Sequence, residues 1–248
     1  MTASDTEARL DSGQWLDRLD NSAALEGMLA SHGAAADAVA ASMAPIGTAG
    51  DEMVSRLAGD DQGRIIYAGA GTSIRIAVQD GVELGPTFNW PAERVAYLVA
   101  GGHGALMNAV ENAEDDFEAA QAGVTRLVMG AADILVAISA SGRTPFTCAA
   151  VTAARRTGAL TIGVANNDGT PLLDSAEIAI PLVTGPEAVA GSTRLKAGTS
   201  QKICLNMIST LVMTRLGYVR DGQMVAMKPG NAKLRERYDR IHGGADRG

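Results

Sequence analysis

The chain has 248 residues, of which 46% are hydrophobic, and this size suits one globular domain with appendages. Its formal net charge is −7, its 21 Lys and Arg residues are scattered, and only 4% of its residues are aromatic. A nucleic-acid-binding protein would be expected to carry a basic face and rings that stack on bases, so we expect no nucleic-acid partner.

The first elements expected along the chain are helices, which the Ala-rich residues 14–58 predict ahead of any strand. Five apolar runs then predict strands at residues 64–70, 95–101, 133–140, 160–166 and 177–183. These runs are nearly continuous rather than alternating, as is typical of strands that are covered on both faces. Helix-like segments separate most of them, so the sequence predicts an α/β fold with a five-stranded parallel sheet flanked by helices.

Helical periodicity in the remaining chain predicts three more helices, at residues 104–121, 203–217 and 231–241. In the first of them, apolar side chains from Leu106 to Phe117 share one stripe, with acidic side chains beside or opposite it. We therefore divide the chain into an N-terminal helical segment, a sheet domain and a C-terminal tail with a short helix, which are residues 1–58, 59–217 and 218–248.

Metal-binding and membrane-spanning patterns are missing from the sequence. The three histidines are far apart, and Cys148 and Cys204 form no spaced pair, so we expect no metal and read both cysteines as packing residues. No apolar run approaches the roughly 18 residues that a membrane span needs. The N-terminal "MTASDTEARLD" is too acidic and polar for a signal peptide. We therefore expect a cytoplasmic protein with no membrane partner.

Polar, glycine-bearing loops follow three of the predicted strands: "GAGTS", "SASGRTP" and the longer "GPEAVAGSTRLKAGTSQK". Ligands of a parallel sheet bind at the carboxyl ends of its strands, where helices begin. Clusters of Gly, Ser and Thr at such positions favour an anion. A dinucleotide fingerprint is excluded, because Ile74 replaces its third glycine and no acidic residue ends the next strand. Two such clusters in one sheet indicate a site for a sugar phosphate.

The first two loops resemble the phosphate-binding pattern of the sugar isomerase (SIS) fold. More narrowly, "GAGTSIRIAVQDGVELGPTF", "ENAEDD", "SASGRTPF", "GPEAVAGSTRLKAGTSQK" and "NAKLRERYDRI" are similar to the N-acetylmuramic acid 6-phosphate etherase family, in the same order over residues 64–241. The family usually has Gly where Ile74 stands and Ala where Gly81 stands. It also has a further helical region beyond the position of Gly248, so the chain resembles a short version.

The resemblance implies a lyase that removes the D-lactyl ether of N-acetylmuramic acid 6-phosphate in cell-wall recycling, without a metal or another cofactor. The opened sugar has an aldehyde at C1 that acidifies the C2 proton, so a base and an acid suffice for elimination. The family's catalytic glutamates correspond to Glu83 as the acid and Glu114 as the base. Glu83 also lies in an apolar, Gly-flanked stretch before a Gly-Pro turn. Glu114 lies in an acidic cluster that is otherwise typical of a solvated helix face.

The family's phosphate-binding positions correspond to four hydroxyl residues: Ser73, Ser139, Ser141 and Thr144. Helix capping is the structural alternative for these residues, and the same geometry can serve both purposes.

The stretch of residues 185–202 is expected to close the pocket over the sugar. Its glycines permit close backbone approach, and Ser192 and Thr193 can hydrogen-bond sugar hydroxyls. Either Arg194 or Lys196 can balance the phosphate and the lactate carboxylate. Glu187 is a further acidic residue here, but its position after a proline favours an exposed turn.

Two other functions share these motifs. A regulatory protein that binds sugar phosphates without catalysis needs the loops but not the two glutamates. An aldose–ketose isomerase needs the C2 base but no acid for a leaving group. For assembly, the apolar stripe of Val39, Met43 and Ile46 and the family resemblance favour a homodimer, and a monomer with folded-back helices is the alternative.

Overall fold

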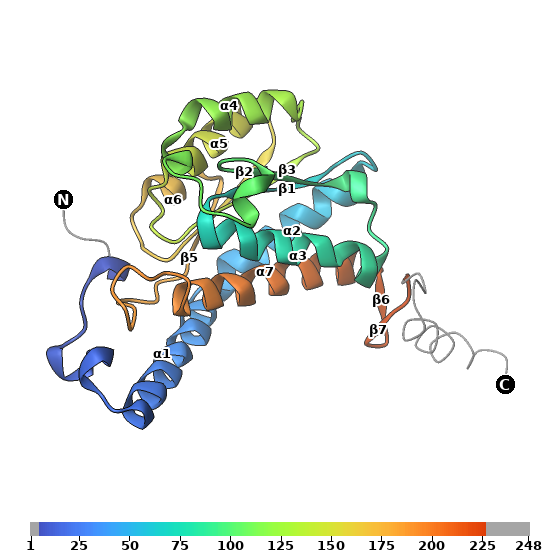
Figure 1. The fold of residues 1–248 in the computed structure, drawn as a ribbon. Coiled ribbons are helices and arrows are strands. Elements are labelled where there is room, and N and C mark those ends of the chain that lie inside the picture. The colour runs from blue at the N-terminus through green and yellow to red at the C-terminus, as the bar shows by residue number, and fades with distance from the viewer. Residues whose placement is uncertain (1–4, 227–248) are drawn as a thin grey trace, which may run out of the picture.

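The computed structural model describes residues 5–226, which form a five-stranded sheet covered by helices on both faces (Figure 1). All of its strands are parallel and lie in the order β2-β1-β3-β4-β5. Their bounds are β1 Ile65–Gly69, β2 Val95–Val99, β3 Ile134–Ser139, β4 Leu160–Ala165 and β5 Ile178–Pro181. The predicted five-stranded parallel sheet is therefore confirmed, with each strand inside its predicted range.

Seven α-helices accompany the sheet: α1 Asn21–Ala41, α2 Met43–Gly59, α3 Gly71–Phe88, α4 Phe117–Arg126, α5 Pro145–Arg156, α6 Pro171–Ser175 and α7 Lys196–Arg215. Helices α2, α3 and α7 cover one face, and α4, α5 and α6 cover the other (Figure 1). Helix α1 packs along α7 and extends past the sheet. A small antiparallel pair, β6 Val219–Arg220 and β7 Gln223–Met224, follows α7.

Two hydrophobic cores separate on the sheet because neighbouring residues of a strand point to opposite faces. In β1, Ile65 and Tyr67 join the core under α2, α3 and α7, whereas Ile66 and Ala68 join the core under α4, α5 and α6. All five residues of β1 are buried. Burial on both faces explains why the strands are continuous apolar runs.

The connection after β2 differs from the prediction. Residues 104–121 do not form one helix, because they contain two 3-10 turns, η5 His103–Leu106 and η6 Ala113–Asp115, before α4 begins. Asn112 has a left-handed backbone conformation with φ of 56°, which a continuous helix cannot contain. Asp116 then caps α4, since its side chain accepts a hydrogen bond from the Ala119 N–H at 2.8 Å.

Other helix boundaries also differ. Helix α7 begins at Lys196, seven residues before the predicted start at residue 203. At the N-terminus, α1 begins at Asn21, and the residues before it form the 3-10 turns η1 Asp5–Glu7, η2 Ser12–Gln14 and η3 Leu16–Arg18. A further 3-10 turn, η4 Ala92–Arg94, precedes β2. The helix predicted at residues 231–241 lies outside the described residues.

A buried carboxylate joins α3 to the sheet and to α7. Asp80 is 4% exposed and accepts hydrogen bonds from the Tyr67 hydroxyl at 2.9 Å, the Asn206 Nδ2 at 2.6 Å and the Ser209 hydroxyl at 3.0 Å. Burial raises the pKa of Tyr67 well above its usual value, and the negative charge of Asp80 adds to this effect. Burial, with a smaller effect of Asp80, also raises the pKa of Tyr97 to about 12. These contacts fix α3 on the sheet.

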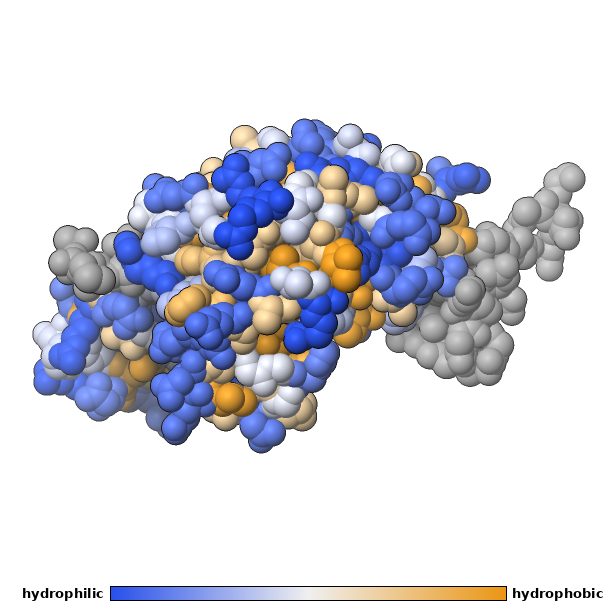
Figure 2. Space-filling model, turned by 90° about the horizontal axis from the view of Figure 1, so that it is seen from above, coloured by the Kyte–Doolittle hydropathy of each residue, from blue (hydrophilic) through white to orange (hydrophobic). Residues whose placement is uncertain are grey.

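The face that α4 and α5 present is mainly hydrophilic, with small apolar patches among charged residues (Figure 2). A larger apolar groove lies between α2 and α7, where Met43, Ile46, Met207 and Leu211 line a cavity of about 770 Å³. No helix within residues 5–226 has the length and apolar character that crossing a membrane would require.

Candidate functional site

The loops after β1, β3, β4 and β5 meet at the carboxyl edge of the sheet. The register places the ends of neighbouring strands side by side, with Gly69 of β1 beside Ile138 of β3, and Ser139 beside Ala165 of β4. Helices α3, α5 and α7 begin at this edge (Figure 1). Their N-terminal N–H groups and helix dipoles make it favourable for an anion.

The loop between β3 and α5 is held by its own hydroxyl groups. Ser139 Oγ lies 3.0 Å from Thr144 Oγ1 and 3.3 Å from Ser141 Oγ. Ser139 Oγ also accepts the N–H of Gly142 at 3.1 Å, and Ser141 Oγ accepts the N–H of Arg143 at 3.2 Å. The structure thus brings three of the predicted phosphate-binding residues together in a loop that hydrogen bonds among its own residues help to hold.

Helix capping does not account for these hydroxyl groups. Thr144 occupies the N-cap position of α5, but its side chain makes no capping hydrogen bond and bonds Ser139 instead. Ser73 lies inside the first turn of α3, whose N-cap residue is Ala70, and its side chain is buried. The capping alternative is therefore wrong for these two residues, and the first N–H groups of both helices have no side-chain cap.

Ile74 does not disturb the start of α3. Its side chain is buried in the core, and its N–H donates to the Ala70 carbonyl at 3.3 Å. The sharp entry to the helix is made by Gly71, which has a φ of 53°.

The loop before α7 contains a buried acidic residue, Glu187, which we expected from the sequence to lie on an exposed turn. Glu187 is 1% exposed, and its carboxylate accepts the N–H groups of Lys196 at 3.2 Å and Ala197 at 2.9 Å. The prediction of an exposed turn residue was wrong, because Glu187 binds the N-terminus of α7, where the helix dipole favours a negative charge.

The polar residues of the same loop divide into exposed and covered groups. Ser192 and Thr193 are half-buried, Arg194 is exposed, and the side chain of Lys196 is buried. Lys196 lines a cavity of about 430 Å³ together with residues of η2 and α1. The two cations that sequence could not distinguish therefore lie in different surroundings, and Lys196 is the one directed inward.

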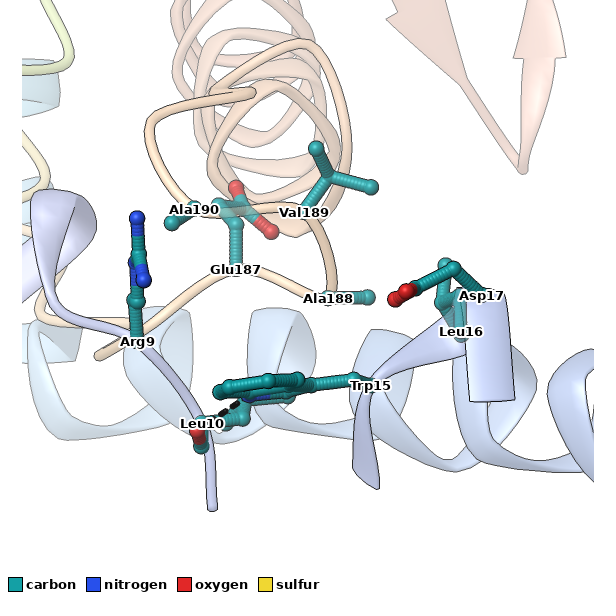
Figure 3. Close-up of a pocket in the computed structure, with 9 residues that line it drawn as sticks. All are labelled: Arg9, Leu10, Trp15, Leu16, Asp17, Glu187, Ala188, Val189 and Ala190. Atoms are coloured by element: carbon teal, nitrogen blue, oxygen red, sulfur yellow. Dashed lines mark hydrogen bonds between the residues drawn. The ribbon is translucent and has the colours of Figure 1, made fainter. Parts of the chain in front are cut away.

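A second cavity of about 430 Å³ lies between this loop and the N-terminal segment (Figure 3). Arg9, Leu10, Trp15, Leu16 and Asp17 form one wall, and residues 187–190 form the other. The N-terminal segment therefore lies beside the carboxyl edge. The sequence analysis predicted helices in this segment but did not place them there.

The predicted catalytic glutamates occupy different places. Glu83 lies within α3, which continues through Pro86 to Phe88, so it does not precede a turn. It is ten residues beyond Ser73, about 15 Å along the helix axis. Glu114 lies in η6, which packs against α5. Both side chains are exposed, and neither has a hydrogen bond or ion pair with another residue of 5–226.

Two asparagines that sequence reasoning missed follow β4 and connect the loops. Asn166 Nδ2 donates to the Leu182 carbonyl at 2.9 Å and to Ser200 Oγ at 2.8 Å, which ties β4 to β5 and α7. Asn167 Nδ2 donates to the Ala140 carbonyl at 2.8 Å, inside the loop after β3. Amides directly after an apolar strand are a signal that could have pointed to them.

Metal binding has no candidate in the part of the chain that is described, since no group of three or more His, Cys, Asp or Glu side chains converges there. Cys204 is buried, which raises the pKa of its thiol to about 12, and Cys148 is half-buried. What the carboxyl edge offers chemically is a set of hydroxyl groups, helix N-termini and a buried lysine.

Two protein-family models match this chain. A model of the glucokinase regulatory protein N-terminal SIS domain matches residues 50–155, and a model of the SIS domain matches residues 107–214. A phosphoheptose isomerase from Francisella tularensis has a TM-score of 0.55 at 20% identity, over 75% of this chain and 93% of that chain. The Neisseria gonorrhoeae phosphoheptose isomerase has a TM-score of 0.54 at 18% identity, over 75% and 94%. These structures show a shared fold.

Closer relatives are N-acetylmuramic acid 6-phosphate etherases. The one from Deinococcus radiodurans is 50% identical over 179 residues, 72% of this chain and 59% of that protein. The one from Streptomyces coelicolor is 48% identical over 204 residues, which are 82% of this chain and 65% of that protein. The one from Rubrobacter xylanophilus is 45% identical over 236 residues, which are 95% of this chain and 78% of that protein. The matched part thus spans between 59% and 78% of these relatives' lengths. By this similarity, the chain belongs to the N-acetylmuramic acid 6-phosphate etherase family.

Proposed function

We propose that the protein is a carbon–oxygen lyase that converts N-acetylmuramic acid 6-phosphate and water into N-acetylglucosamine 6-phosphate and D-lactate, in amino-sugar recycling. The observation that carries the proposal is its identity of 45–50% with curated etherases. The hydroxyl-rich loops at the carboxyl edge support a phosphorylated ligand. Two unpaired cysteines suit a reducing compartment, and we place the enzyme in the cytoplasm.

The elimination needs two proton transfers, the hydration that follows needs two more, and no electron transfer is involved. Glu114 removes the C2 proton of the open-chain sugar, and the resulting enolate expels the lactyl oxygen from C3. Glu83 gives that oxygen its proton as the carbon–oxygen bond breaks. Water then adds across the double bond, with its hydroxyl at C3 and a proton at C2, which restores the sugar aldehyde. Both proton transfers of the elimination are general acid–base catalysis by a carboxyl group.

The assay that tests this function is release of lactate from N-acetylmuramic acid 6-phosphate by the purified protein. Lactate release supports the etherase. Binding of the sugar phosphate without any product would support a regulatory protein, and interconversion of aldose and ketose phosphates would support an isomerase.

The sugar phosphate is held, in this proposal, by Ser73 and the three hydroxyl groups of the loop after β3, with the N-termini of α3 and α5. Ser141→Ala and Thr144→Ala are each expected to weaken binding of phosphorylated sugars by about 1.5–3 kcal/mol, because each removes a hydrogen bond to a charged group. Titration calorimetry with N-acetylglucosamine 6-phosphate measures this loss. Thr152→Ala is a control, because its hydroxyl bonds the Cys148 carbonyl within α5. Unchanged affinity in both loop variants would place the phosphate elsewhere.

The protein forms a homodimer whose sites are shared between subunits, in our proposal. Glu83 is about 15 Å along α3 from Ser73. Only five covalent bonds of about 1.5 Å separate the phosphorus of a hexose 6-phosphate from C3. A single chain therefore does not bring Glu83 to the C3 substituent of a sugar held at its own Ser73, whereas a partner's α3 could. The apolar groove between α2 and α7 gives a second copy a surface to bury.

The shared site predicts that two inactive variants complement each other. Random mixing of Glu83→Gln chains with chains carrying both Ser141→Ala and Thr144→Ala makes half of the dimers mixed. Each mixed dimer has one intact site, so about a quarter of the wild-type lactate release should return. Either variant alone should stay inactive. A mass near 25.5 kDa by light scattering, with full activity, would contradict the shared site.

A further inference from the structure

The N-terminal segment is bonded to the carboxyl edge of the sheet through one buried residue. Thr6 is 0% exposed, and its N–H donates to Asn167 Oδ1 at 3.2 Å. The Asn167 Nδ2 donates in return to Thr6 Oγ1 at 3.1 Å. The N–H of Gly191 donates to the Thr6 carbonyl at 3.0 Å. Every polar group of Thr6 therefore bonds a loop that is far away in the sequence.

These bonds connect three loops of the candidate site. Asn167 follows β4 and also donates to the Ala140 carbonyl, between the two serines of the loop after β3. Gly191 belongs to the loop after β5 and has a φ of 73°. A side-chain carbon at Gly191 would lie 2.6 Å from Glu7 Oε2, so the N-terminal segment packs directly against this glycine.

Thr6 bonds the loop after β5 directly and reaches the loop after β3 only through Asn167. The cavity of about 430 Å³ in Figure 3 separates residues 187–190 from the N-terminal segment, so little apolar packing holds the loop on that side. The loop after β3 is held by hydrogen bonds among its own residues and by bonds from the N–H groups of Asn166 and Leu172, none of which involves Thr6. Displacing Thr6 should therefore move Ser192 and Thr193 while leaving the hydroxyl groups of Ser139 and Thr144 in place.

We infer that Thr6 is a positioning residue of the site, which fixes the sugar-facing loop at residues 185–195 relative to the phosphate-binding loop. The inference rests on the proposed function in one respect, namely that the carboxyl edge binds a sugar phosphate. It assigns the N-terminal segment to the site and gives the two loops separate roles. The loop after β3 contacts the phosphate group but not the sugar, and Thr6 is needed only for the contacts that the sugar adds.

The test compares two ligands in two variants of Thr6. Thr6→Val keeps the shape of the side chain but removes the hydroxyl that accepts from Asn167, and Thr6→Ser keeps that hydroxyl. Calorimetry should show that Thr6→Val binds N-acetylglucosamine 6-phosphate about three- to tenfold more weakly, the usual effect of one buried hydrogen bond. Inorganic phosphate, measured by competition, should bind within about twofold of the wild-type value. Thr6→Ser should bind both ligands as the wild type does.

A second variant acts from the other side of the contact. Gly191→Ala places a methyl group against Glu7 and should show the same selective loss of sugar-phosphate affinity. Gly217→Ala is its control, because Gly217 also has a positive φ, of 88°, but a side-chain carbon there meets no atom within 4 Å. Thermal unfolding checks that each variant is folded at the temperature of the titration.

The outcomes separate this inference from the etherase proposal. Wild-type affinity for the sugar phosphate in both Thr6→Val and Gly191→Ala would overturn it, and so would equal losses for sugar phosphate and inorganic phosphate. If the variants show the selective loss of affinity but the wild-type protein releases no lactate, only the etherase proposal is overturned. A wild-type protein that binds neither ligand would overturn both.

Discussion

Glu83→Gln is expected to lower lactate release from N-acetylmuramic acid 6-phosphate by about 10²–10⁴-fold, the usual contribution of general acid catalysis. The amide has nearly the shape of the carboxyl group but has no acidic proton to give to the departing lactyl oxygen. Binding should change little, because the expected phosphate ligands are hydroxyl groups and helix N-termini, whereas Glu83 is expected to act only on the lactyl oxygen at C3. The measurements are lactate release under saturating substrate and calorimetric affinity for the same ligand.

The position of Glu83 makes this variant informative. Its side chain is exposed on α3 and has no bonding partner within residues 5–226, so its replacement removes no contact that holds the fold. Glu93→Gln is a matched control, since Glu93 is also an exposed glutamate but lies outside α3, in η4. Full activity of Glu83→Gln would remove this residue from the mechanism.

The variant also separates the two proton transfers. If Glu83 acts only on the leaving group, Glu83→Gln should still exchange the C2 proton of the substrate with solvent while it releases no lactate. Simultaneous loss of exchange and release, with binding intact, would mean that Glu83 also takes part in forming the enolate.

The sheet could be predicted from the sequence because the physical signal is local and strong. A parallel strand covered on both faces must be apolar at every position, and residues 133–140 contain such a run around the observed strand Ile134–Ser139. The clustering of hydroxyl groups after β3 was predictable for the same reason. Ser139, Ser141 and Thr144 lie within six residues of one another, and the hydrogen bonds that join them are local.

The connection after β2 could not be predicted from periodicity alone. The apolar stripe from Leu106 to Phe117 matches a helix in spacing, but spacing carries no information about backbone conformation at Asn112. A residue with a left-handed conformation and an acidic N-cap four residues later divide the segment. Asp and Asn serve as caps and turn residues as readily as they occupy an exposed helix face, which is why the pattern misled.

The contacts of Glu187 and Thr6 could not be predicted from the sequence for a different reason. Glu187 is buried because α7 begins at Lys196, and the apolar pattern placed that start at residue 203. Thr6 bonds Asn167, 161 residues away, and no periodicity connects such distant positions. The roles of Glu83 and Glu114 came from the family resemblance, since neither burial nor hydrogen bonding distinguishes them from other exposed acids.

Glu114→Gln is expected to suppress exchange of the C2 proton and, with it, lactate release, each by about 10²–10⁴-fold. Glu114 lies in η6, which packs against α5, the helix that begins at the hydroxyl-rich loop after β3. An amide cannot take up the proton, so no enolate forms and the lactyl oxygen is not expelled. Proton exchange is measured by NMR in deuterated water.

Asp115→Asn tests whether the effect belongs to Glu114 or to the charge of the cluster. Asp115 is the next residue in η6, is also exposed, and its replacement removes the same negative charge. It should exchange the C2 proton at the wild-type rate. Normal exchange in Glu114→Gln would place the base elsewhere, and equal losses in both variants would attribute the effect to the charge of η6. If Glu114→Gln loses exchange while Asp115→Asn and Glu83→Gln retain it, the base and the acid are separate residues. The reason is that the base acts first, so its loss stops both removal of the C2 proton and expulsion of the lactyl oxygen.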